Sequence, residues 1–192
     1  MSIIKLEATS TLPTKFGEFV IKVFVDSSKK EHVVLIKGEI NSTKPVNVRL
    51  HSKCFTGDTL TSLRCDCREQ LEFSMNYTNK NGGVILYLDQ EGRGIGLSNK
   101  LKAYSLQDSG LDTVEANEKL GFGADLRDYK IASQILNLLG INKINLITNN
   151  PEKVKDLESH GIKILGRIPV NIKPNKYNKK YLDTKRSKMG HL

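Results

Sequence analysis

REQLEFSMNYTNKNGGVILYL, residues 68–88, marks the point where one pattern of secondary structure gives way to another. Residues 68–79 have helical character, Asn81-Gly82-Gly83 is a turn signal, and VILYL (84–88) has the length and composition of a buried strand. The chain before this stretch therefore follows a different pattern from the chain after it.

Two apolar runs precede the switch, EFVIKVFV (18–25) and HVVLI (32–36), with polar turns around Ser27 and Asn41. Their alternation and β-branched content predict strands paired as antiparallel hairpins. After the switch the patterns predict helices at 97–107, 127–139 and 151–159, a strand at 143–148, and a glycine-rich loop near Gly121 and Gly123. We expect an α+β or mixed α/β fold, in which N-terminal antiparallel β hairpins pack with a C-terminal part of alternating helices and strands.

Glycines and apolar spacing refine the predicted helices. A left-handed C-terminal cap favours glycine, and three glycines fall just past the helices: Gly110, Gly140 and Gly161. The helix at 127–139 carries apolar residues at helical spacing, which we expect in the core: Ile131, Ile135, Leu138 and Leu139.

The composition is that of a globular protein. With 192 residues, 38% hydrophobic and 27% charged, the chain can bury one sizeable core. No stretch approaches the roughly 18 apolar residues of a spanning helix, and the N-terminus has no leader pattern. We therefore expect a single domain over residues 1–172 in a cytoplasmic protein with no membrane partner.

A net charge of +9 favours an anionic partner such as nucleic acid, an acidic membrane surface or a polyphosphate. Much of the excess lies in the last twenty residues, which we interpret as a basic C-terminal tail over residues 173–192, with its flexibility left open. Because a solvated tail accounts for this charge, we do not expect nucleic acid as a partner.

The cysteines form one cluster, Cys54-x10-Cys65-Asp66-Cys67, and the rest of the chain has none. An odd count in a cytosolic chain argues against a disulfide framework. Free cysteines are often small buried hydrophobes, but the surroundings here, LHSKCFTGD and LRCDCREQ, are polar and contain glycine. Metal binding is the better interpretation, and three soft thiolates suit one zinc ion in a reducing compartment.

Two kinds of zinc site remain open at this point. A structural zinc takes four protein ligands, and His51, three residues before Cys54, could be the fourth. A catalytic zinc keeps one position for water and lowers the pKa of that water toward neutrality. Three thiolates donate much negative charge and weaken this effect, so a catalytic site would need a nearby cation or hydrogen-bond network.

Joined to the segments around it, the cluster resembles GTP cyclohydrolase II, the first enzyme of riboflavin synthesis. The matching segments follow the family's order from about residue 49 to the C-terminus: RLHSKC (49–54), TGD (56–58), RCDC (64–67), QL (70–71), QEGRGIGL (90–97), NK (99–100), AY (103–104), LQD (106–108), DTVEAN (112–117), LGF (120–122), RD (127–128), TNNP (148–151), Lys153, YL (181–182) and KMGH (188–191). No single segment decides the resemblance, but the ordered set is specific. It implies a GTP cyclohydrolase II-like catalytic domain over residues 1–172.

In that family three cysteines hold a zinc ion whose bound water attacks C8 of guanine. Ring opening, loss of formate and release of pyrophosphate then give 2,5-diamino-6-ribosylamino-4(3H)-pyrimidinone 5′-phosphate, although some relatives stop at the ring-opened formamide. The resemblance thus implies one zinc per subunit on Cys54, Cys65 and Cys67. It also implies GTP as substrate, magnesium with the triphosphate, and a homodimer.

Three residues match the family's catalytic positions. The proposed proton acceptor maps to Asp125, the proposed nucleophile at the α-phosphate to Arg127, and an active-site tyrosine to Tyr104. Because an arginine stays protonated, with a pKa above about 12, stabilisation of the departing pyrophosphate is the safer role for Arg127. Without the family, residues 125–128 would be a helix start with acids near the positive dipole end.

The same resemblance implies a GTP site, in which Glu91 is suited to accept hydrogen bonds from guanine. Arg49 and Lys153 would supply charge to the phosphates, whereas alone they would be two solvated basic residues. The loop 91–96 follows a strand and opens a helix, so its amides could cradle phosphate, although its G-x-G-x-G spacing is not the dinucleotide fingerprint. The implied contacts are Arg49, Leu50, His51, Ser52, Lys53, Gln70, Glu91, Gly92, Arg93, Thr113, Thr148 and Lys153.

Three positions depart from the family's usual pattern: Lys53 stands for a glutamate, Arg68 for a glycine, and Asp89 for an arginine. Arg68 requires backbone angles that an ordinary residue can adopt. These departures leave two alternatives, a diverged homologue that binds a nucleotide without completing the ring opening, and a structural zinc protein whose basic tail binds nucleic acid. Retention of Asp125, Arg127 and Tyr104, together with all three cysteines, argues against both.

Overall fold

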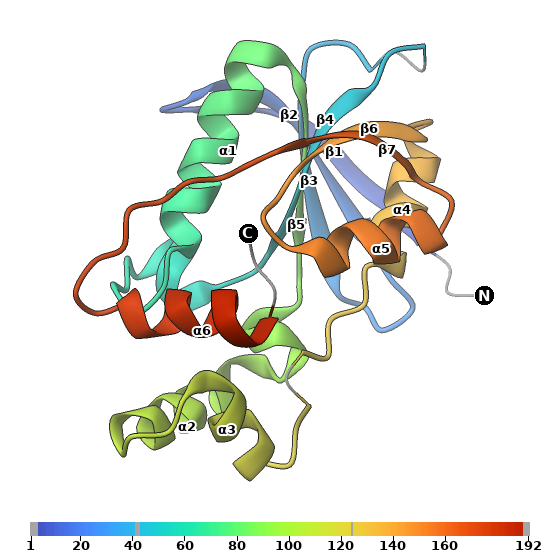
Figure 1. Cartoon of the computed structure of the whole chain (residues 1–192). Helices are drawn as coiled ribbons and strands as arrows, with labels where there is room; N and C mark the ends of the chain where they lie inside the picture. The colour runs from blue at the N-terminus through green and yellow to red at the C-terminus, as the bar shows by residue number, and fades with distance from the viewer. Residues whose placement is uncertain (1–3, 41–42, 124, 190–192) are drawn as a thin grey trace. The chain divides into compact units, whose positions relative to one another are not determined.

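One mixed β-sheet organises the part of the chain that the computed structural model describes, residues 4–40, 43–123 and 125–189. Its strands lie in the order β1-β2-β3-β5-β4-β6-β7 (Figure 1). They are β1 (Lys5–Thr14), β2 (Gly17–Val25), β3 (Glu31–Lys37), β4 (Val46–Ser52), β5 (Gly83–Leu88), β6 (Lys143–Ile147) and β7 (Lys163–Ile168). Strand β2 pairs antiparallel with β1 and β3, and β3 with β5, whereas β6 pairs parallel with β4 and β7. The predicted hairpins and the mixed α/β class are confirmed.

The helices follow the strands in the expected alternation. They are α1 (Cys67–Asn81), α2 (Gly96–Asp108), α3 (Thr113–Lys119), α4 (Lys130–Leu138), α5 (Pro151–Ser159) and α6 (Lys179–Met189), with a π turn η1 (Phe55–Thr59) and a 3-10 turn η2 (Glu91–Gly94). Gly110, Gly140 and Gly161 have positive φ, as predicted for helix ends. No separate prediction covered β1, β4, β7, α3 or α6.

The smaller apolar layer lies on the face of the sheet that α1 covers. Phe19, Leu35 and Ile85 form it, one residue from each of β2, β3 and β5, and Leu71 and Met75 of α1 pack against them. Because side chains alternate across a strand, the residues next to these point to the opposite face.

The larger layer lies on that opposite face, where α4 and α5 lie (Figure 1). Phe24, Val34 and Leu86 belong to it, together with Ile135 of α4 and Leu157 of α5. The sequence pattern of buried strands flanked by amphipathic helices thus produces a sheet covered on both faces.

Helix α4 differs from its prediction in two respects. It begins at Lys130, not at residue 127, and the Asp128 carboxylate accepts a hydrogen bond from the Lys130 N–H at 2.7 Å in the turn before it. Leu138 is 59% exposed, so its assignment to the core is wrong. It lies two residues past the buried Leu136, about 200° around the helix, and so faces away from the sheet. Ile135 is buried as expected.

The chain divides into two compact units. Unit 1 comprises Met1–His51, Leu71–Asp89 and Asp128–Val170, and unit 2 comprises Ser52–Gln70, Gln90–Arg127 and Asn171–Leu192. Unit 1 holds the sheet with α4 and α5, and unit 2 holds η1, η2, α2, α3 and α6. The boundary between a domain over 1–172 and a tail over 173–192 stays a prediction, and the end of the KMGH segment, 190–191, lies outside the described residues.

Within the described residues, none of the helices is both long enough and apolar enough to cross a membrane.

Candidate functional site

The three cysteines converge in unit 2. Cys54 follows β4 and precedes η1, and Cys67 is the first residue of α1. The sulfur of Cys54 lies 3.7 Å from that of Cys65, and the three sulfur atoms lie within 4.8 Å of one another. Tetrahedral zinc with bonds of about 2.3 Å would hold its sulfur ligands about 3.8 Å apart, so these residues fit zinc.

Gly57 gives the cluster its room. A Cβ atom at this position would lie 2.8 Å from Cys65 Sγ and 3.1 Å from Cys54 Sγ. The η1 turn that carries Gly57 is held by Asp58, whose carboxylate accepts a hydrogen bond from the Cys54 N–H at 3.0 Å. The loop therefore wraps the sulfur atoms so closely that only glycine fits at its centre.

His51 does not join this cluster. Among the described residues, the group that could ligate a metal consists of Cys54, Cys65 and Cys67. His51 is buried on β4, with its ring stacked on Tyr87 at 5.4 Å between centroids. The donor set is therefore three thiols, which is the arrangement of a site with a position left for water or substrate.

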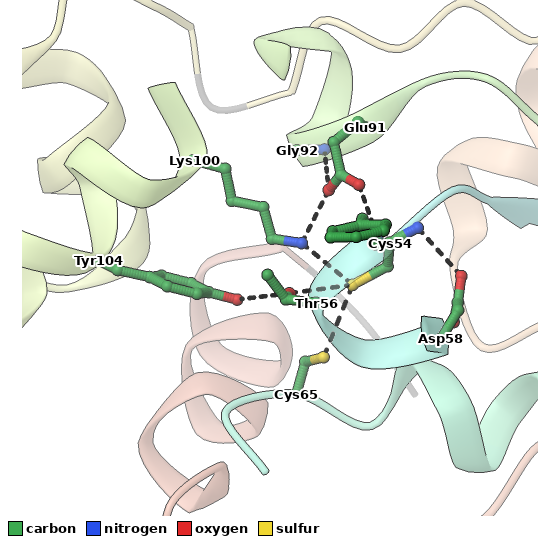
Figure 2. Close-up of polar contacts among 9 residues, drawn as sticks. Cys54, Thr56, Asp58, Cys65, Glu91, Gly92, Lys100 and Tyr104 are labelled. Atoms are coloured by element: carbon green, nitrogen blue, oxygen red, sulfur yellow. Dashed lines mark hydrogen bonds and ion pairs between the residues drawn. The ribbon is translucent and has the colours of Figure 1, made fainter. Parts of the chain in front are cut away.

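A buried cation contacts the cluster. Lys100 Nζ of α2 lies 3.1 Å from Cys54 Sγ and donates to Glu91 Oε1 at 2.7 Å (Figure 2). The Glu91 carboxylate also accepts hydrogen bonds from the Phe55 N–H at 2.6 Å and the Gly92 N–H at 3.0 Å. No role for Lys100 was predicted from the sequence, because the position of a lysine on a helix does not indicate which groups its ammonium contacts.

These contacts set the charges of the cluster. Hydrogen bonds from Cys65 and Cys67, together with Lys100, hold the pKa of the Cys54 thiol well below its usual range against the effect of burial. The neighbouring Cys54 in turn raises the pKa of Cys65 to about 11. Burial alone would lower the pKa of Lys100, but Glu91 and Cys54 raise it above its ordinary value, so the ammonium group stays charged.

Tyr104 lies on the same helix as Lys100, one turn further on. Its hydroxyl is 3.5 Å from Thr56 Oγ1, and the Arg64 guanidinium lies over its ring at 4.6 Å. Arg64 is in turn paired with Asp108. Burial raises the pKa of Tyr104 to about 12, so the phenol is protonated at neutral pH.

Asp125 and Arg127 form an ion pair in unit 2. Arg127 Nε donates to Asp125 Oδ1 at 2.8 Å, and Arg127 also reaches Ser52 Oγ at 3.5 Å. Although burial alone would raise it, the pKa of the Asp125 carboxyl is lowered by Arg127. Residues 125–127 lie outside any helix, so the interpretation of this segment as a helix start is wrong.

The Glu91–Gly94 turn follows β5 and leads into α2, as predicted for a glycine-rich loop between a strand and a helix. Gly92, Arg93 and Gly94 all have left-handed backbones, with φ of 61°, 60° and 93°. The Arg93 carbonyl accepts a hydrogen bond from the Leu126 N–H at 3.1 Å. The loop is thereby joined to the segment that carries Asp125.

The C-terminal segment also contacts this region of unit 2. Asn178 is 1% exposed, and its side-chain amide donates to the Cys65 carbonyl at 3.5 Å. Arg93 lies over the ring of Tyr181 of α6 at 5.9 Å. The segment expected to be a basic tail therefore supplies a buried hydrogen bond to the cysteine loop and a cation–ring contact to the 91–94 loop.

Comparison with known proteins identifies the family. A family profile described as GTP cyclohydrolase II matches residues 5–169. The chain belongs to the GTP cyclohydrolase II family. The resemblance seen in the sequence is therefore confirmed, and with it the expectation of an enzyme.

Two relatives carry the name GTP cyclohydrolase-2. That of Campylobacter hominis is 52% identical over 189 residues, covering 98% of this chain and 95% of the relative. That of Campylobacter fetus subsp. fetus is 52% identical over 192 residues, covering 100% and 97%. Riboflavin biosynthesis protein RibBA of Chlorobium phaeovibrioides is 55% identical over 185 residues, and there the chain covers only 45% of the relative's length.

In this GTP cyclohydrolase II family member, several predicted site residues belong to unit 1 and are buried there. Arg49 donates to the Ile147 carbonyl at 3.0 Å, and Lys153 donates to the Leu50 carbonyl at 2.7 Å. Both are at most 6% exposed, so the interpretation of these two as solvated basic residues is wrong. Thr148 Oγ1 accepts a hydrogen bond from the Asn150 N–H at 3.0 Å, at the start of α5.

Two predicted residues of unit 2 lie in the first turns of helices. Gln70 is near the start of α1 and donates to Asp66 Oδ2 at 2.5 Å. Thr113 is the first residue of α3, which Asp112 and Glu115 cap reciprocally. That capping box, D-x-x-E, is a signal from which the sequence could have yielded α3.

One departure from the family pattern has a structural account. Arg68 lies within α1, is not among the residues with positive φ, and donates to the Asp58 carbonyl at 3.2 Å. The glycine usual in the family is therefore not required by the backbone here. The hydrogen bond from the Asp89 N–H to His32 Nδ1 at 3.2 Å uses the main chain, so it does not explain the change of side chain.

Proposed function

We propose that the chain is a zinc-dependent GTP cyclohydrolase II that opens the guanine ring of GTP at C8 and releases formate and pyrophosphate. The product would be 2,5-diamino-6-ribosylamino-4(3H)-pyrimidinone 5′-phosphate, for riboflavin biosynthesis. The observation that carries the proposal is the convergence of Cys54, Cys65 and Cys67 in a member of this family. When bound there, zinc supplies Lewis acidity, which makes hydroxide available as a nucleophile near neutral pH.

Tyr104 and Asp125 are proposed to move the protons. Because burial keeps the Tyr104 phenol protonated, it can donate to a guanine ring nitrogen as C8 is attacked. The Asp125 carboxyl is held in its ionised form by Arg127, so it can accept a proton. The two groups thus have the opposite protonation states that acid and base roles require.

The basic residues are proposed to bind the triphosphate. Arg127 would stabilise the departing pyrophosphate, and Arg93, Arg49 and Lys153 would add positive charge, while magnesium would accompany the triphosphate and neutralise part of its charge. Arginine suits this role because its guanidinium stays charged and donates in a fork that matches phosphate.

Glu91 is proposed to contact guanine. An ionised carboxylate offers about four acceptor positions. Protein donors take three of them, Lys100 and the N–H groups of Phe55 and Gly92, which leaves capacity for a base. The remaining residues carried over from the family are Leu50, His51, Ser52, Lys53, Gln70, Gly92, Thr113 and Thr148.

We also propose a homodimer in the cytoplasm. The dimer follows from the resemblance, and the reducing compartment suits a chain whose three cysteines are free thiols.

The test is to incubate the purified, zinc-loaded protein with GTP and magnesium and to follow formate and pyrophosphate separately. Cys65→Ser serves as the control, because it removes one sulfur ligand with little change in size. We expect both products from the wild type and no formate from the variant.

The other outcomes identify the alternatives. Pyrophosphate without formate would mean a reaction that stops before deformylation. Release of neither product with GTP still bound would replace the proposal with a diverged nucleotide-binding homologue. Salt-dependent RNA binding without turnover would support a structural zinc protein, a reading that the Cys54, Cys65 and Cys67 donor set does not favour.

A further inference from the structure

Lys100 lies between Cys54, a candidate metal ligand, and Glu91 of the 91–94 loop. Its ammonium group lies 3.1 Å from Cys54 Sγ and 2.7 Å from Glu91 Oε1, and its side chain is only 12% exposed (Figure 2). The stem of Lys100 is packed against Gly92, where a Cβ atom would lie 3.1 Å from Lys100 Cβ. The 91–94 loop and the Lys100 side chain are therefore closely packed, and a residue larger than glycine at position 92 would displace the lysine.

A zinc centre with three thiolates carries excess negative charge, which a neighbouring cation such as Lys100 offsets. Three thiolates outweigh the two charges of zinc, and their electron donation lowers the Lewis acidity of the metal. A hydrogen bond from an ammonium group to one thiolate withdraws part of that charge and fixes the direction of the sulfur. Lys100 is the cation that contacts Cys54, whereas Arg64 pairs with Asp108.

We propose that Lys100 is a positioning residue for the metal centre, which donates to Cys54 and Glu91 together and so couples the cysteine ligand to the 91–94 loop. This rests on the proposed zinc-dependent function. The compact ammonium group suits the task, because its three donors can serve two acceptors at once. The Glu91 carboxylate holds the ammonium group in place through its own bonds to Phe55 and Gly92.

The consequence is reciprocal. Any ligand that draws on the Glu91 carboxylate changes how strongly Lys100 donates to Cys54, and a metal on Cys54 changes how strongly Lys100 holds Glu91. Linkage requires the two effects to be equal in free energy. Nucleotide binding and metal affinity should therefore depend on each other in the wild type and lose that dependence without the ammonium group.

The experiment compares Lys100→Met, Lys100→Arg and the control Lys102→Met, which removes an exposed lysine from the same helix. Zinc affinity is measured by competition with a chromophoric chelator. Cobalt substitution then reports the thiolate-to-metal charge-transfer band, with and without GTP. We expect K100M to bind zinc about 10- to 100-fold more weakly, the range typical of lost outer ligand contacts, and to shift the band. K102M should match the wild type, and K100R should recover part of the affinity because it keeps a charged donor.

The readouts separate this inference from the function on which it rests. If K100M equals K102M in zinc affinity and in the cobalt band, the role of Lys100 is refuted while the zinc site stands. If GTP shifts the cobalt band of K100M as much as that of the wild type, Lys100 does not couple the 91–94 loop to the cysteine ligand, and the proposal is overturned. If the wild type shows no thiolate-to-cobalt band, the zinc site itself is refuted. Circular dichroism of each variant checks that the fold is kept.

Discussion

Arg127 donates to Asp125 Oδ1 twice, from its Nε at 2.8 Å and from its backbone N–H at 3.1 Å. The two residues proposed for proton transfer and phosphate binding therefore fix each other's charge and direction. Asp125 and Arg127 can be substituted one at a time, so the contribution of their ion pair to stability can be measured.

The pH dependence of stability should reveal this pair. Because the pKa of Asp125 is lowered in the folded chain, its stabilisation is complete above the unfolded value of about 3.9 and is lost as pH falls through the folded value. We expect Asp125→Asn to unfold at a lower temperature than the wild type near neutral pH, with the difference shrinking below about pH 4. Thermal unfolding across this range measures it. Asp183→Asn controls for loss of an exposed carboxylate, and a difference that grows on acidification would contradict the assignment.

Gly57→Ala tests the space between the sulfur atoms. The added methyl group would lie 2.8 Å from Cys65 Sγ, so the loop must shift. The free-energy cost of such overpacking is typically about 1–3 kcal/mol. We expect zinc affinity to fall by about tenfold or more, as measured by chelator competition. Gly123→Ala is the matched change, since its nearest neighbour is the flexible Leu126 side chain at 3.4 Å. Equal zinc affinity in the two variants would mean that the loop yields easily.

Two substitutions of Arg93 separate backbone strain from side-chain function. Arg93→Ala and Arg93→Gly lose the same guanidinium, but only glycine adopts a φ of 60° without strain. We expect the glycine variant to be more stable than the alanine variant by about 1 kcal/mol. Denaturant unfolding gives this difference directly. Both variants should weaken GTP binding alike, and an alanine variant as stable as the glycine one would remove the argument for strain.

Leu136→Ala and Leu138→Ala test the buried face of α4. Leu136 is fully buried in the larger apolar layer, whereas Leu138 is 59% exposed. We expect Leu136→Ala to lower the free energy of unfolding by about 2–5 kcal/mol and Leu138→Ala to change it by no more than about 0.5 kcal/mol. Denaturant titration of the two variants decides it. Similar losses from both would place Leu138 back in the core.

Hydrophobic periodicity predicted most of the helices and strands. It missed or misplaced elements whose limits depend on local side-chain geometry. Alternation and β-branched content identified β2 and β3, and a short apolar run identified β5, whose residues are mostly buried. Strand β7 was not predicted because Gly166 interrupts its apolar pattern. Glycine is needed there because the Asn145 side chain of β6 leaves no room for a Cβ atom. The start of α4 was misplaced because Asp125 bonds to Arg127 rather than capping a helix.

Within the candidate site, composition revealed the cysteines but not what surrounds them. Cys54, Cys65 and Cys67 are close in sequence and scarce elsewhere, so their convergence could be predicted. Lys100 lies 46 residues from Cys54, and no spacing rule joins a helical lysine to a thiol at that distance. The need for a cation beside three thiolates was predictable from chemistry, whereas its identity required the structure.

The bond from Asn178 to the Cys65 carbonyl spans 113 residues and has a consequence for how the protein is made. A nascent chain folds as its segments leave the ribosome, and this contact can form only after Asn178 has emerged, well after the three cysteines. Until then the Cys65 carbonyl lacks this hydrogen-bond donor. A chain truncated before Asn178 would therefore lack the buried donor to the Cys65 carbonyl beside the three thiols.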